Sequence, residues 1–326
     1  MKITMAHGSG GKATGELIEK IFAGRFSNEI LDDMEDCAVV PGTAQIAITT
    51  DSFVVTPLEY SGGDIGRLCI CGTVNDLLAR GAKPKYITCG FIIEEGTDTD
   101  LLERIADSMA ATASESGVLI VAGDTKVIEG DGGLYINTTG VGIMQEGIDI
   151  SCKNCKPEDV VILSGNIGDH HAAILSHRMN IDNTIESDNA PLVDMVEGLL
   201  ENNIEIHAMR DVTRGGLGTV LCELARSSGV GIEIQEEKIP VDIQVRAFAK
   251  ILGLDIMHMG NEGKLVAIVP GKDSERALEI IRGRKYGENA QIIGYVTEGA
   301  GVTMLTSIGG KRMVGELIGE GLPRIC

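Results

Sequence analysis

Segments typical of β-strands alternate with segments typical of α-helices along almost the whole chain. The predicted strands of the first half, which are rich in Ile, Val and Thr, are residues 44–55, 86–94, 118–128 and 134–144. The predicted helices of the same half, which carry apolar side chains three to four residues apart, are residues 10–24, 63–80 and 98–116. This alternation restricts the chain to folds in which helices pack against sheets. We therefore expect a mixed α/β protein.

A polar segment near residue 150 separates this half from a second half with a similar pattern. The segment GIDISCKNCKPEDV contains Pro157 and precedes a predicted strand at 160–164. Further strands are predicted at 231–235, 264–269, 291–297 and 301–306, and helices at 190–202, 215–228, 242–252 and 273–283. Because 326 residues are enough for about two domains, we expect an N-terminal domain at 1–150, a C-terminal domain at 151–314 and a mobile tail at 315–326.

The net charge excludes several classes of function. The chain has 28 Lys and Arg residues against 48 Asp and Glu residues, which gives a net charge of −20. Nucleic acids and anionic membranes are bound by basic residues that neutralise phosphate, so we expect neither partner. The N-terminus does not resemble a signal peptide, and no apolar run is long enough to span a membrane. Eight irregularly spaced cysteines are typical of reduced thiols, which predicts a cytoplasmic protein.

A glycine-rich segment near the N-terminus, HGSGG at 7–11, precedes a predicted helix. Small residues ahead of a helix expose backbone amides that can bind the phosphate groups of a nucleotide. Gly10 and Gly11 are the residues that we expect at such a site. The same composition is also common in turns that bind nothing, so both interpretations stay open.

Four aspartates lie close to a predicted strand end or helix start. They are Asp36, Asp51, Asp76 and Asp124. Open α/β folds place ligand-binding groups at such positions. Carboxylates that converge there repel one another, and Mg²⁺ bound together with phosphate groups offsets this repulsion. The alternative for each aspartate taken alone is that it caps a helix or a turn.

Three short motifs place charged and polar residues side by side. They are GDTKV with Asp124, Thr125 and Lys126, RDVTRGGLG with Asp211 and Arg214, and MGNEGKL with Asn261 and Glu262. The first two combine an acid, a hydroxyl and a base within a few residues, and we expect all three in loops or turns. The alternative is that they are surface turns without a function.

Cys152 and Cys155 form a single C-x-x-C motif, and three histidines follow in the segment GDHHAAILSHR. A structural zinc site usually needs a second pair of ligands. The histidine segment instead predicts a loop that enters a helix. Zinc binding or redox chemistry at Cys152 and Cys155 is therefore an alternative with less support than the acidic motifs have.

The motifs taken together resemble those of one family, the HypE hydrogenase maturation factors. They are HGSGGKA, TTDSFVV, GGDIGRLCICGTVNDLLARGAKP, CGFIIEEG, GDTKV, RDVTRGG, NEGKL and the terminal PRIC, from His7 to Cys326. The family belongs to an ATP-binding, PurM-like superfamily that includes aminoimidazole ribonucleotide (AIR) synthetase and selenophosphate synthetase. The terminal PRIC makes the resemblance specific. It implies two mixed α/β domains and a homodimer formed through N-terminal strands, for which 44–55 and 86–94 are candidates.

The resemblance also implies a reaction at the last residue of the chain. In this family the C-terminal cysteine, here Cys326, receives a carbamoyl group from the carbamoyltransferase HypF. ATP then drives dehydration of the S-carboxamide to an S-cyanide, and the cyano group passes to iron in a HypC–HypD complex for the [NiFe] hydrogenase centre. A carrier thiol must visit two sites, and a glycine-containing tail with Pro323 near its end suits both visits.

Matching positions carry the family's site residues onto this chain. The implied Mg²⁺ and phosphate ligands are Asp36, Asp51, Asp76, Asp124 and Asp211, with Asn75, Thr125, Gly10 and Gly11 beside the nucleotide. The resemblance implies that Lys126 stabilises charge on the γ-phosphate or the amide oxygen, and that Glu262 removes the amide proton, although these two roles are interchangeable. In MEDCAVV, Glu35 stands in place of the first of the superfamily's paired aspartates, so only Asp36 is expected to be a ligand there.

Two other functions agree with parts of the sequence. Another ATP-dependent enzyme of the superfamily would share the acidic motifs, but a selenophosphate synthetase typically has a reactive cysteine in the early glycine-rich segment, and here no cysteine precedes Cys37. An AIR synthetase has no use for a terminal thiol. A non-enzymatic carrier would present Cys326 to partner proteins without binding Mg·ATP, so nucleotide turnover distinguishes it from the dehydratase.

Overall fold

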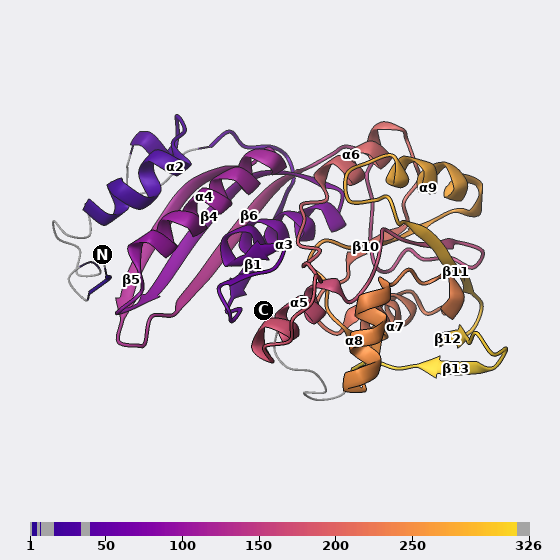
Figure 1. Cartoon of the computed structure of the whole chain (residues 1–326). Helices are drawn as coiled ribbons and strands as arrows, with labels where there is room; N and C mark the ends of the chain where they lie inside the picture. Colours follow the sequence, from indigo (N-terminus) through magenta and orange to yellow (C-terminus); the bar gives the residue numbers. More distant parts are fainter. Residues whose placement is uncertain (1, 5–6, 8–15, 34–39, 318–326) are drawn as a thin grey trace.

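The computed structural model describes residues 2–4, 7, 16–33 and 40–317, which form two large sheets with helices packed against them. Figure 1 shows the sheets beside each other, with the first half of the chain on the left and the second half on the right. This arrangement confirms the predicted mixed α/β class. Within the described ranges, no helix is both long enough and apolar enough to cross a membrane.

The first sheet contains four strands in the order β1-β6-β4-β5. Their bounds are Ile46–Phe53 for β1, Ala82–Glu94 for β4, Leu119–Ile128 for β5 and Leu134–Met144 for β6. β4 and β5 are parallel, and the other neighbours are antiparallel. Helices α3 (Ile65–Ala79) and α4 (Thr99–Ser116) pack together on one face of this sheet. The strands β1 and β5 are therefore its two outer strands.

Helix α3 lies at the centre of the molecule. Thirteen of its fifteen residues are buried, which explains why its sequence is apolar on all sides instead of on one. Asp64 caps its N-terminus by accepting a hydrogen bond from the backbone N–H of Arg67 at 2.9 Å. Asp64 ends a small hairpin made of β2 (Glu59–Tyr60) and β3 (Gly63–Asp64). Helix α3 thus contacts the first sheet on one side and the second half of the chain on the other.

The second sheet contains seven strands in the order β13-β12-β9-β11-β7-β10-β8. Their bounds are Val160–Leu163 (β7), Ala208–Asp211 (β8), Gly231–Gln235 (β9), Leu265–Val269 (β10), Gln291–Thr297 (β11), Gly301–Leu305 (β12) and Lys311–Val314 (β13). Helices α6 (Val193–Glu201) and α9 (Ser274–Arg282) cover one face, and α7 (Gly216–Ser228) covers the other. All five residues of β10 are buried because both faces are covered.

Most of the predicted elements are present, with corrections at particular segments. The motif GDTKV was expected in a loop, but residues 124–126 lie inside β5. The expectations did not include strands β8 and β13, which have four residues each and weak patterns. Residues 18–23 form a π-helix at the end of the first predicted helix. The histidine segment does enter a helix, α5 (Asp169–Arg178).

The face of the first sheet opposite α3 and α4 carries exposed apolar side chains. These are Ile46, Ile48, Ile92, Leu119 and Ile128, of which Ile48 is 64% exposed. Ile48 pairs with Val141, Val141 with Tyr86, and Tyr86 with Leu119, so an apolar row crosses all four strands. A patch of this kind marks an interaction surface more often than a solvated one. We call this side of the sheet the open face.

Candidate active site

Four carboxyl groups from separate parts of the chain gather at the junction of the two halves. They are Asp51 on β1, Asp76 on α3, Asp211 at the end of β8 and Glu262 in the loop before β10. The pKa values of Asp51 and Asp211 are both raised to about 6. Burial is the main cause in each case, and the charge of Asp76 is the second. We call these four residues the acidic cluster. Their mutual repulsion makes the cluster a place where a cation is favoured.

Glu262 is the most buried member of the acidic cluster, with 5% of its surface exposed. Burial raises the pKa of its carboxyl well above the usual value, and the charges of Asp188, Asp211 and Asp51 raise it further. The charge of Arg214, in the loop that precedes α7, acts in the opposite direction. A buried carboxyl with a raised pKa is suited to accept a proton during catalysis.

The local sequence explains how β1 and α3 bring two of these carboxylates together. Thr49 and Asp51 are two residues apart on a strand, so both point to the face that packs on α3. Gly72 and Asp76 are four residues apart on the helix and share one side of it. A Cβ atom at Gly72 would lie 3.0 Å from Phe53 and 3.9 Å from Asp51 Oδ2, so the glycine permits close approach. The hydroxyl of Thr49 then donates to Asp76 Oδ2 at 2.7 Å.

Asn75 lies beside the acidic cluster, but its polar atoms join the two halves of the chain. Its Nδ2 donates to the carbonyl of Ala190 at 3.0 Å, and its Oδ1 accepts from the backbone N–H of Leu192 at 2.9 Å. The side chain is buried. Both ends of the amide are therefore occupied by the backbone of residues 190–192.

Asp124 and Lys126 lie far across the first sheet from the acidic cluster. Both are on β5, the outer strand opposite β1. Asp124 pairs with Gly90 and Lys126 with the exposed Ile92, which places both side chains on the open face, whereas Asp51 and Asp76 lie on the helix side. Lys126 donates to Asp124 at 2.8 Å, and both side chains are more than 60% exposed. The intervening Thr125 is buried on the helix side. One chain alone does not bring Asp124 and Lys126 to the acidic cluster.

Four predicted site residues lie outside the described ranges, namely Gly10, Gly11, Asp36 and Cys326. The start of the C-terminal segment is described up to Leu317. The backbone N–H of Leu317 donates to the hydroxyl of Thr219, which lies in the first turn of α7, at 3.2 Å. Glu316 forms an ion pair with Arg226 on the same helix. Helix α7 directly follows Asp211 and Arg214 in the chain. The C-terminal segment therefore approaches the element next to the acidic cluster.

The acidic cluster fits Mg²⁺ bound together with phosphate better than Mg²⁺ bound by protein alone. In the part of the chain that the structure describes, no three His, Cys, Asp or Glu side chains are arranged to hold a metal ion, and this applies to Cys152 and Cys155 as well. Mg²⁺ usually takes only one or two carboxylates and completes its shell with water and phosphate. The crowded carboxylates Asp51, Asp76 and Asp211 have the donor atoms that this mode needs.

Two residues that sequence patterns did not single out also belong to this region. Thr49 holds Asp76, and Asp188 accepts a hydrogen bond from the backbone N–H of Glu262 at 3.1 Å. The doubled hydroxyl in TTDSF was the only signal for Thr49. Asp188 lies in a segment without regular structure, ESDNAP, and its sequence gives no sign of its contact with Glu262.

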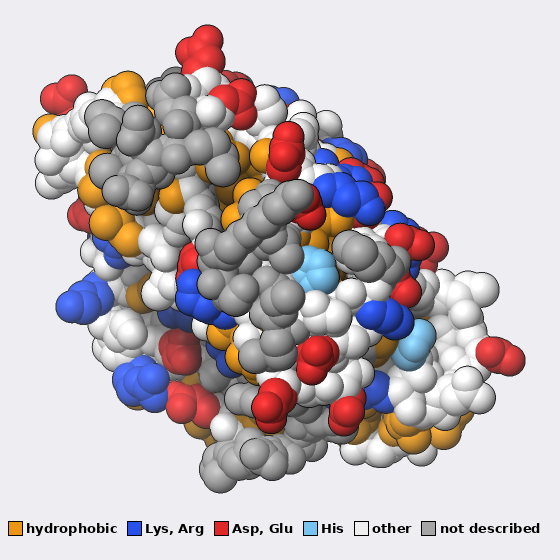
Figure 2. All heavy atoms as spheres, turned by 90° about the vertical axis from the view of Figure 1, so that its left-hand side faces the viewer, with side chains coloured by type: hydrophobic (Ala, Val, Ile, Leu, Met, Phe, Trp, Pro, Cys, Tyr) orange, Lys and Arg blue, Asp and Glu red, His pale blue; other side chains and the backbone are white. Residues whose placement is uncertain are grey.

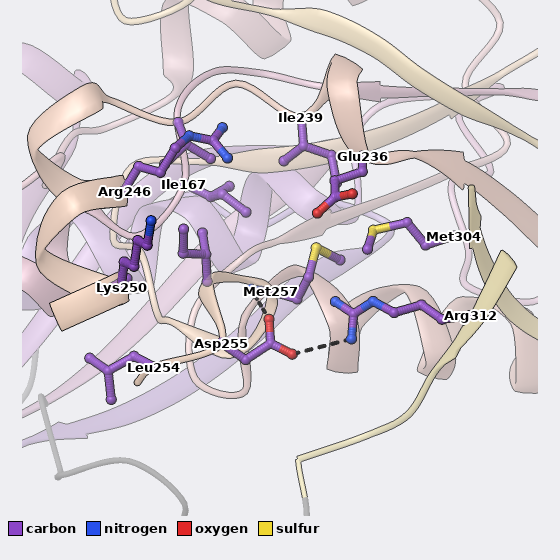
Figure 3. A pocket seen from close by; sticks show the side chains of 13 residues that line it. Ile167, Glu236, Ile239, Arg246, Lys250, Leu254, Asp255, Met257, Met304 and Arg312 are labelled. Carbon is purple, nitrogen blue, oxygen red and sulfur yellow. Dashed lines mark hydrogen bonds and ion pairs between the residues drawn. The ribbon is translucent and has the colours of Figure 1, made fainter. Parts of the chain in front are cut away.

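A separate cavity of about 240 Å³ lies in the second half, between α8 (Ile243–Leu252), β12 and β13. Figure 3 shows Arg246 and Lys250 of α8 on one side and the ion pair of Asp255 with Arg312 on another. Its remaining wall is largely apolar. None of the residues that line it belongs to the acidic cluster. On the face drawn in Figure 2, acidic and basic side chains are interspersed with exposed hydrophobic ones.

The chain matches two protein-family models in succession. The N-terminal domain of AIR synthase related proteins matches residues 34–144, and the C-terminal domain of the same family matches residues 156–306. The first match contains Asp51, Asp76 and Asp124, and the second contains Asp211 and Glu262.

Individual relatives are similar over nearly the whole length. The chain is 48% identical to the carbamoyl dehydratase HypE of Azotobacter vinelandii, across 99% of this chain and 97% of that protein. A crystal structure of the hydrogenase maturation protein HypE in complex with ATP is 42% identical, with a TM-score of 0.96 and coverage of 99% of both chains. A crystal structure of a HypE–HypF complex matches at 47% identity and a TM-score of 0.81, over 92% of this chain and 99% of that chain. The chain therefore belongs to the HypE family of carbamoyl dehydratases, built from the two AIR synthase related domains.

Proposed function

We propose that the chain is an ATP-dependent dehydratase that converts an S-carboxamide on its own Cys326 into an S-cyanide. The observation that carries this proposal is the acidic cluster, which lies next to the helix that the C-terminal segment contacts. The segment is described to Leu317, and residues 318–326 span about 30 Å when extended. We expect that length to let Cys326 reach a nucleotide bound at the cluster.

The reaction needs a leaving group and a base. The amide oxygen attacks the γ-phosphate of ATP, so ADP leaves and the amide becomes an iminophosphate with loss of one N–H proton. The C–O bond then breaks, phosphate departs, the second N–H proton is removed, and C≡N remains on the sulfur. Phosphoryl transfer depends mainly on positioning and on neutralising charge. Mg²⁺ would supply that neutralisation when bound.

We assign these tasks to the residues of the acidic cluster. Asp51, Asp76 and Asp211 would hold Mg²⁺ with the phosphates of ATP, and Glu262 would take the amide proton. A HypE solved with ATP at 42% identity supports nucleotide binding by this chain. Asp36, Gly10 and Gly11 complete the proposed nucleotide site from the N-terminal segments, and Cys326 is the carrier.

We also propose that the protein acts as a homodimer formed through the open face. Exposed Ile46 and Ile48 on β1 and Ile92 on β4 give that face its apolar area. Asp124 and Lys126 lie on the same face, so a second copy packed there would bring them close to another chain. This arrangement would give Lys126 its proposed role on the γ-phosphate or amide oxygen, which it lacks in one chain.

The proposed partners follow from the two ends of the reaction. HypF would supply the carbamoyl group, and a complex of HypE with HypF among the similar structures supports this. A HypC–HypD complex would accept the cyano group for the [NiFe] centre. We place the domains at 1–150 and 151–314, with 315–326 as the carrier tail.

Intact-mass spectrometry tests the function directly. The protein is incubated with HypF, carbamoyl phosphate and ATP, and the reaction is stopped while the carbamoyl adduct is still present. The protein is then separated from nucleotide and HypF and incubated with or without fresh Mg·ATP. We expect a carbamoyl adduct on Cys326 that loses the mass of one water only when ATP is present. Cys326→Ser is the control and should acquire no adduct. An adduct that forms but never dehydrates would make the protein a carrier without the enzymatic step.

A further inference from the structure

The proposed reaction releases two amide protons in each turnover, and they must leave a buried site. This inference therefore rests on the proposed function, and on Glu262 as the base. Only 5% of the Glu262 surface is exposed, so a proton on its carboxyl needs a path to solvent. A base that cannot lose its proton acts only once.

A cavity of about 350 Å³ lies next to the Glu262 loop, between the two halves of the chain. Its wall includes Asp169 at the start of α5, Asp188 and Asn189 from the segment that follows α5, and Lys264 two residues after Glu262. Glu186 and Glu288, whose side chains are exposed, also line it. The cavity therefore reaches solvent.

Buried oxygens without a hydrogen-bond partner gather at this cavity. Among the described residues, four buried side-chain N or O atoms have no hydrogen-bond partner, and three of them are Asp169 Oδ1, Asp188 Oδ2 and Asn189 Oδ1. All three residues line the cavity. The Asp188 side chain is 2% exposed, and Asn189 is 4% exposed. Buried acceptors of this kind are normally met by water or a proton, so the cavity is suited to hold both.

Contacts connect the cavity to Glu262. Asp188 Oδ1 accepts from the backbone N–H of Glu262 at 3.1 Å, and Asp188 Oδ2 lies 3.3 Å from Lys264 Nζ. Of the charges that act on the Glu262 carboxyl, that of Asp188 acts most strongly. Burial, and then the charge of Asp188, raises the pKa of Asp169 to about 7, which allows Asp169 to exchange protons near neutral pH. Asp188 thus links the backbone of the Glu262 loop to the cavity.

We propose that Asp188 and Asp169 form a proton relay from Glu262 to the cavity, with Lys264 holding Asp188 in place. The amide N–H proton moves to the Glu262 carboxylate. Glu262 passes this proton to Asp188 and becomes a carboxylate again. Asp188 passes it through cavity water to Asp169, and Asp169 releases it to solvent. Each transfer returns the donor to its starting state, so no other reactant is needed.

The test uses Asp169→Asn in the full-length protein, carbamoylated on Cys326 by HypF. Asn has the same shape but cannot carry a proton. We expect the rate constant for dehydration to fall about tenfold or more, since one acid–base step is lost, while carbamoylation and ATP affinity stay as in the wild type. Glu288→Gln is the matched control, because Glu288 lines the same cavity but is exposed, and it should dehydrate at the wild-type rate.

Restoration of the reaction by small proton carriers distinguishes a proton relay from a purely structural role of Asp169. A cavity of this volume admits formate or imidazole, either of which can carry the proton in place of Asp169. We expect either molecule to restore dehydration by Asp169→Asn in a concentration-dependent way. A wild-type rate in Asp169→Asn, or a loss that neither molecule restores, would overturn the relay. Failure of the wild type to dehydrate would instead refute the proposed function itself. Full activity of Glu262→Gln would remove Glu262 as the base, and the relay with it, but would leave the dehydratase function standing.

Discussion

At the scale of single residues, Asp76 is the carboxylate whose charge acts on two other members of the acidic cluster. It accepts from Thr49, and its charge raises the pKa of both Asp51 and Asp211. We expect Asp76→Asn to abolish ATP hydrolysis, because a neutral amide holds Mg²⁺ poorly, and to leave carbamoylation of Cys326 intact. ADP release measures the first property and intact mass the second. Asp100→Asn, a change at an exposed position on α4, should affect neither, and hydrolysis by Asp76→Asn would remove Asp76 from the site.

A variant of Glu262 distinguishes a residue that accepts the amide proton from one that only binds ATP. Gln resembles the protonated carboxyl that burial favours, so Glu262→Gln should fold normally and bind ATP with nearly wild-type affinity. It cannot accept a proton, and we expect dehydration to slow by about a hundredfold or more. Calorimetry gives the affinity, and the mass change of the carbamoylated protein gives the rate. Equal losses in both would show that Glu262 binds nucleotide.

The raised pKa of Asp51 predicts how stability depends on pH. The pKa is 3.8 in the unfolded chain and about 6 in the folded protein, so folding favours the protonated carboxyl. This contribution to the free energy of unfolding is complete below pH 3.8 and is lost as pH rises through 6. The side chain of Asp51→Asn does not titrate. The difference between its melting temperature and that of the wild type should therefore shift in favour of the variant as pH rises from 4 to 7. A difference in melting temperature that stays constant across this range would contradict the raised pKa of Asp51. Mg·ATP should reduce the pH dependence of that difference.

Sequence motifs predicted which residues belong to the site better than they predicted which of these residues lie close together. Asp51, Asp76, Asp211 and Glu262 were predicted from motifs far apart in the chain, and the structure places them together. Asp124, in contrast, was predicted from a similar motif, but its side chain lies on the open face of the first sheet, opposite to the side on which Asp51 and Asp76 lie. The alternation of side chains along a strand decides the face, and a motif expected in a loop gives no such information.

At the scale of elements, the segment 186–192 couples α3 to the Glu262 loop without forming a helix or strand. Its backbone accepts from Asn75 and Arg67 on α3, and Asp188 holds the Glu262 loop. Sequence patterns reveal helices and strands through periodicity. This segment has no periodicity, so its position could not be predicted, although the elements on both sides of it were.

The close packing of this segment on the Glu262 loop gives a prediction for Gly263. A Cβ atom there would lie 1.9 Å from the carbonyl oxygen of Asp188 and 2.8 Å from the backbone N of Ala190. We expect Gly263→Ala to lower the free energy of unfolding by about 1–3 kcal/mol and to slow dehydration, because the loop must move. Urea denaturation measures the first effect. Gly271→Ala is the control, since its Cβ would lie at an ordinary 3.5 Å from Glu158 O, and equal stability of the two variants would contradict the prediction.

At the scale of the whole molecule, one hydrophobic core runs through both halves. Residues of the first sheet and α3 share it with α6, α9 and one face of the second sheet. The acidic cluster lies where these halves meet, so both must fold before the site exists. Composition and alternation predicted the two α/β halves, but the contact between them depends on buried α3, whose sequence is apolar all round and does not specify which partner lies on each side.

The open face leads to a prediction about how copies of the chain cooperate. Asp76 lies on the helix side of the first sheet and Lys126 on its open face, so one chain keeps the two residues apart. We expect a dimer formed through the open face to supply them to one site from different chains. Asp76→Asn and Lys126→Ala should each be inactive as homodimers. In a mixed dimer, one of the two sites would contain both wild-type residues.

We therefore expect an equimolar mixture of the two variants, after subunit exchange, to recover roughly a quarter of the wild-type dehydration rate, since half of the dimers are mixed and each has one intact site. A mixture of Asp76→Asn with Asp51→Asn is the control. Those two residues lie in the same cluster of one chain, so every site in that mixture carries a defect and no recovery is expected. Recovery in neither mixture would mean that Lys126 acts within its own chain or outside the reaction. Recovery in the first mixture alone would place Lys126 in the site of its neighbour, because only a shared site can be repaired by exchanging whole subunits.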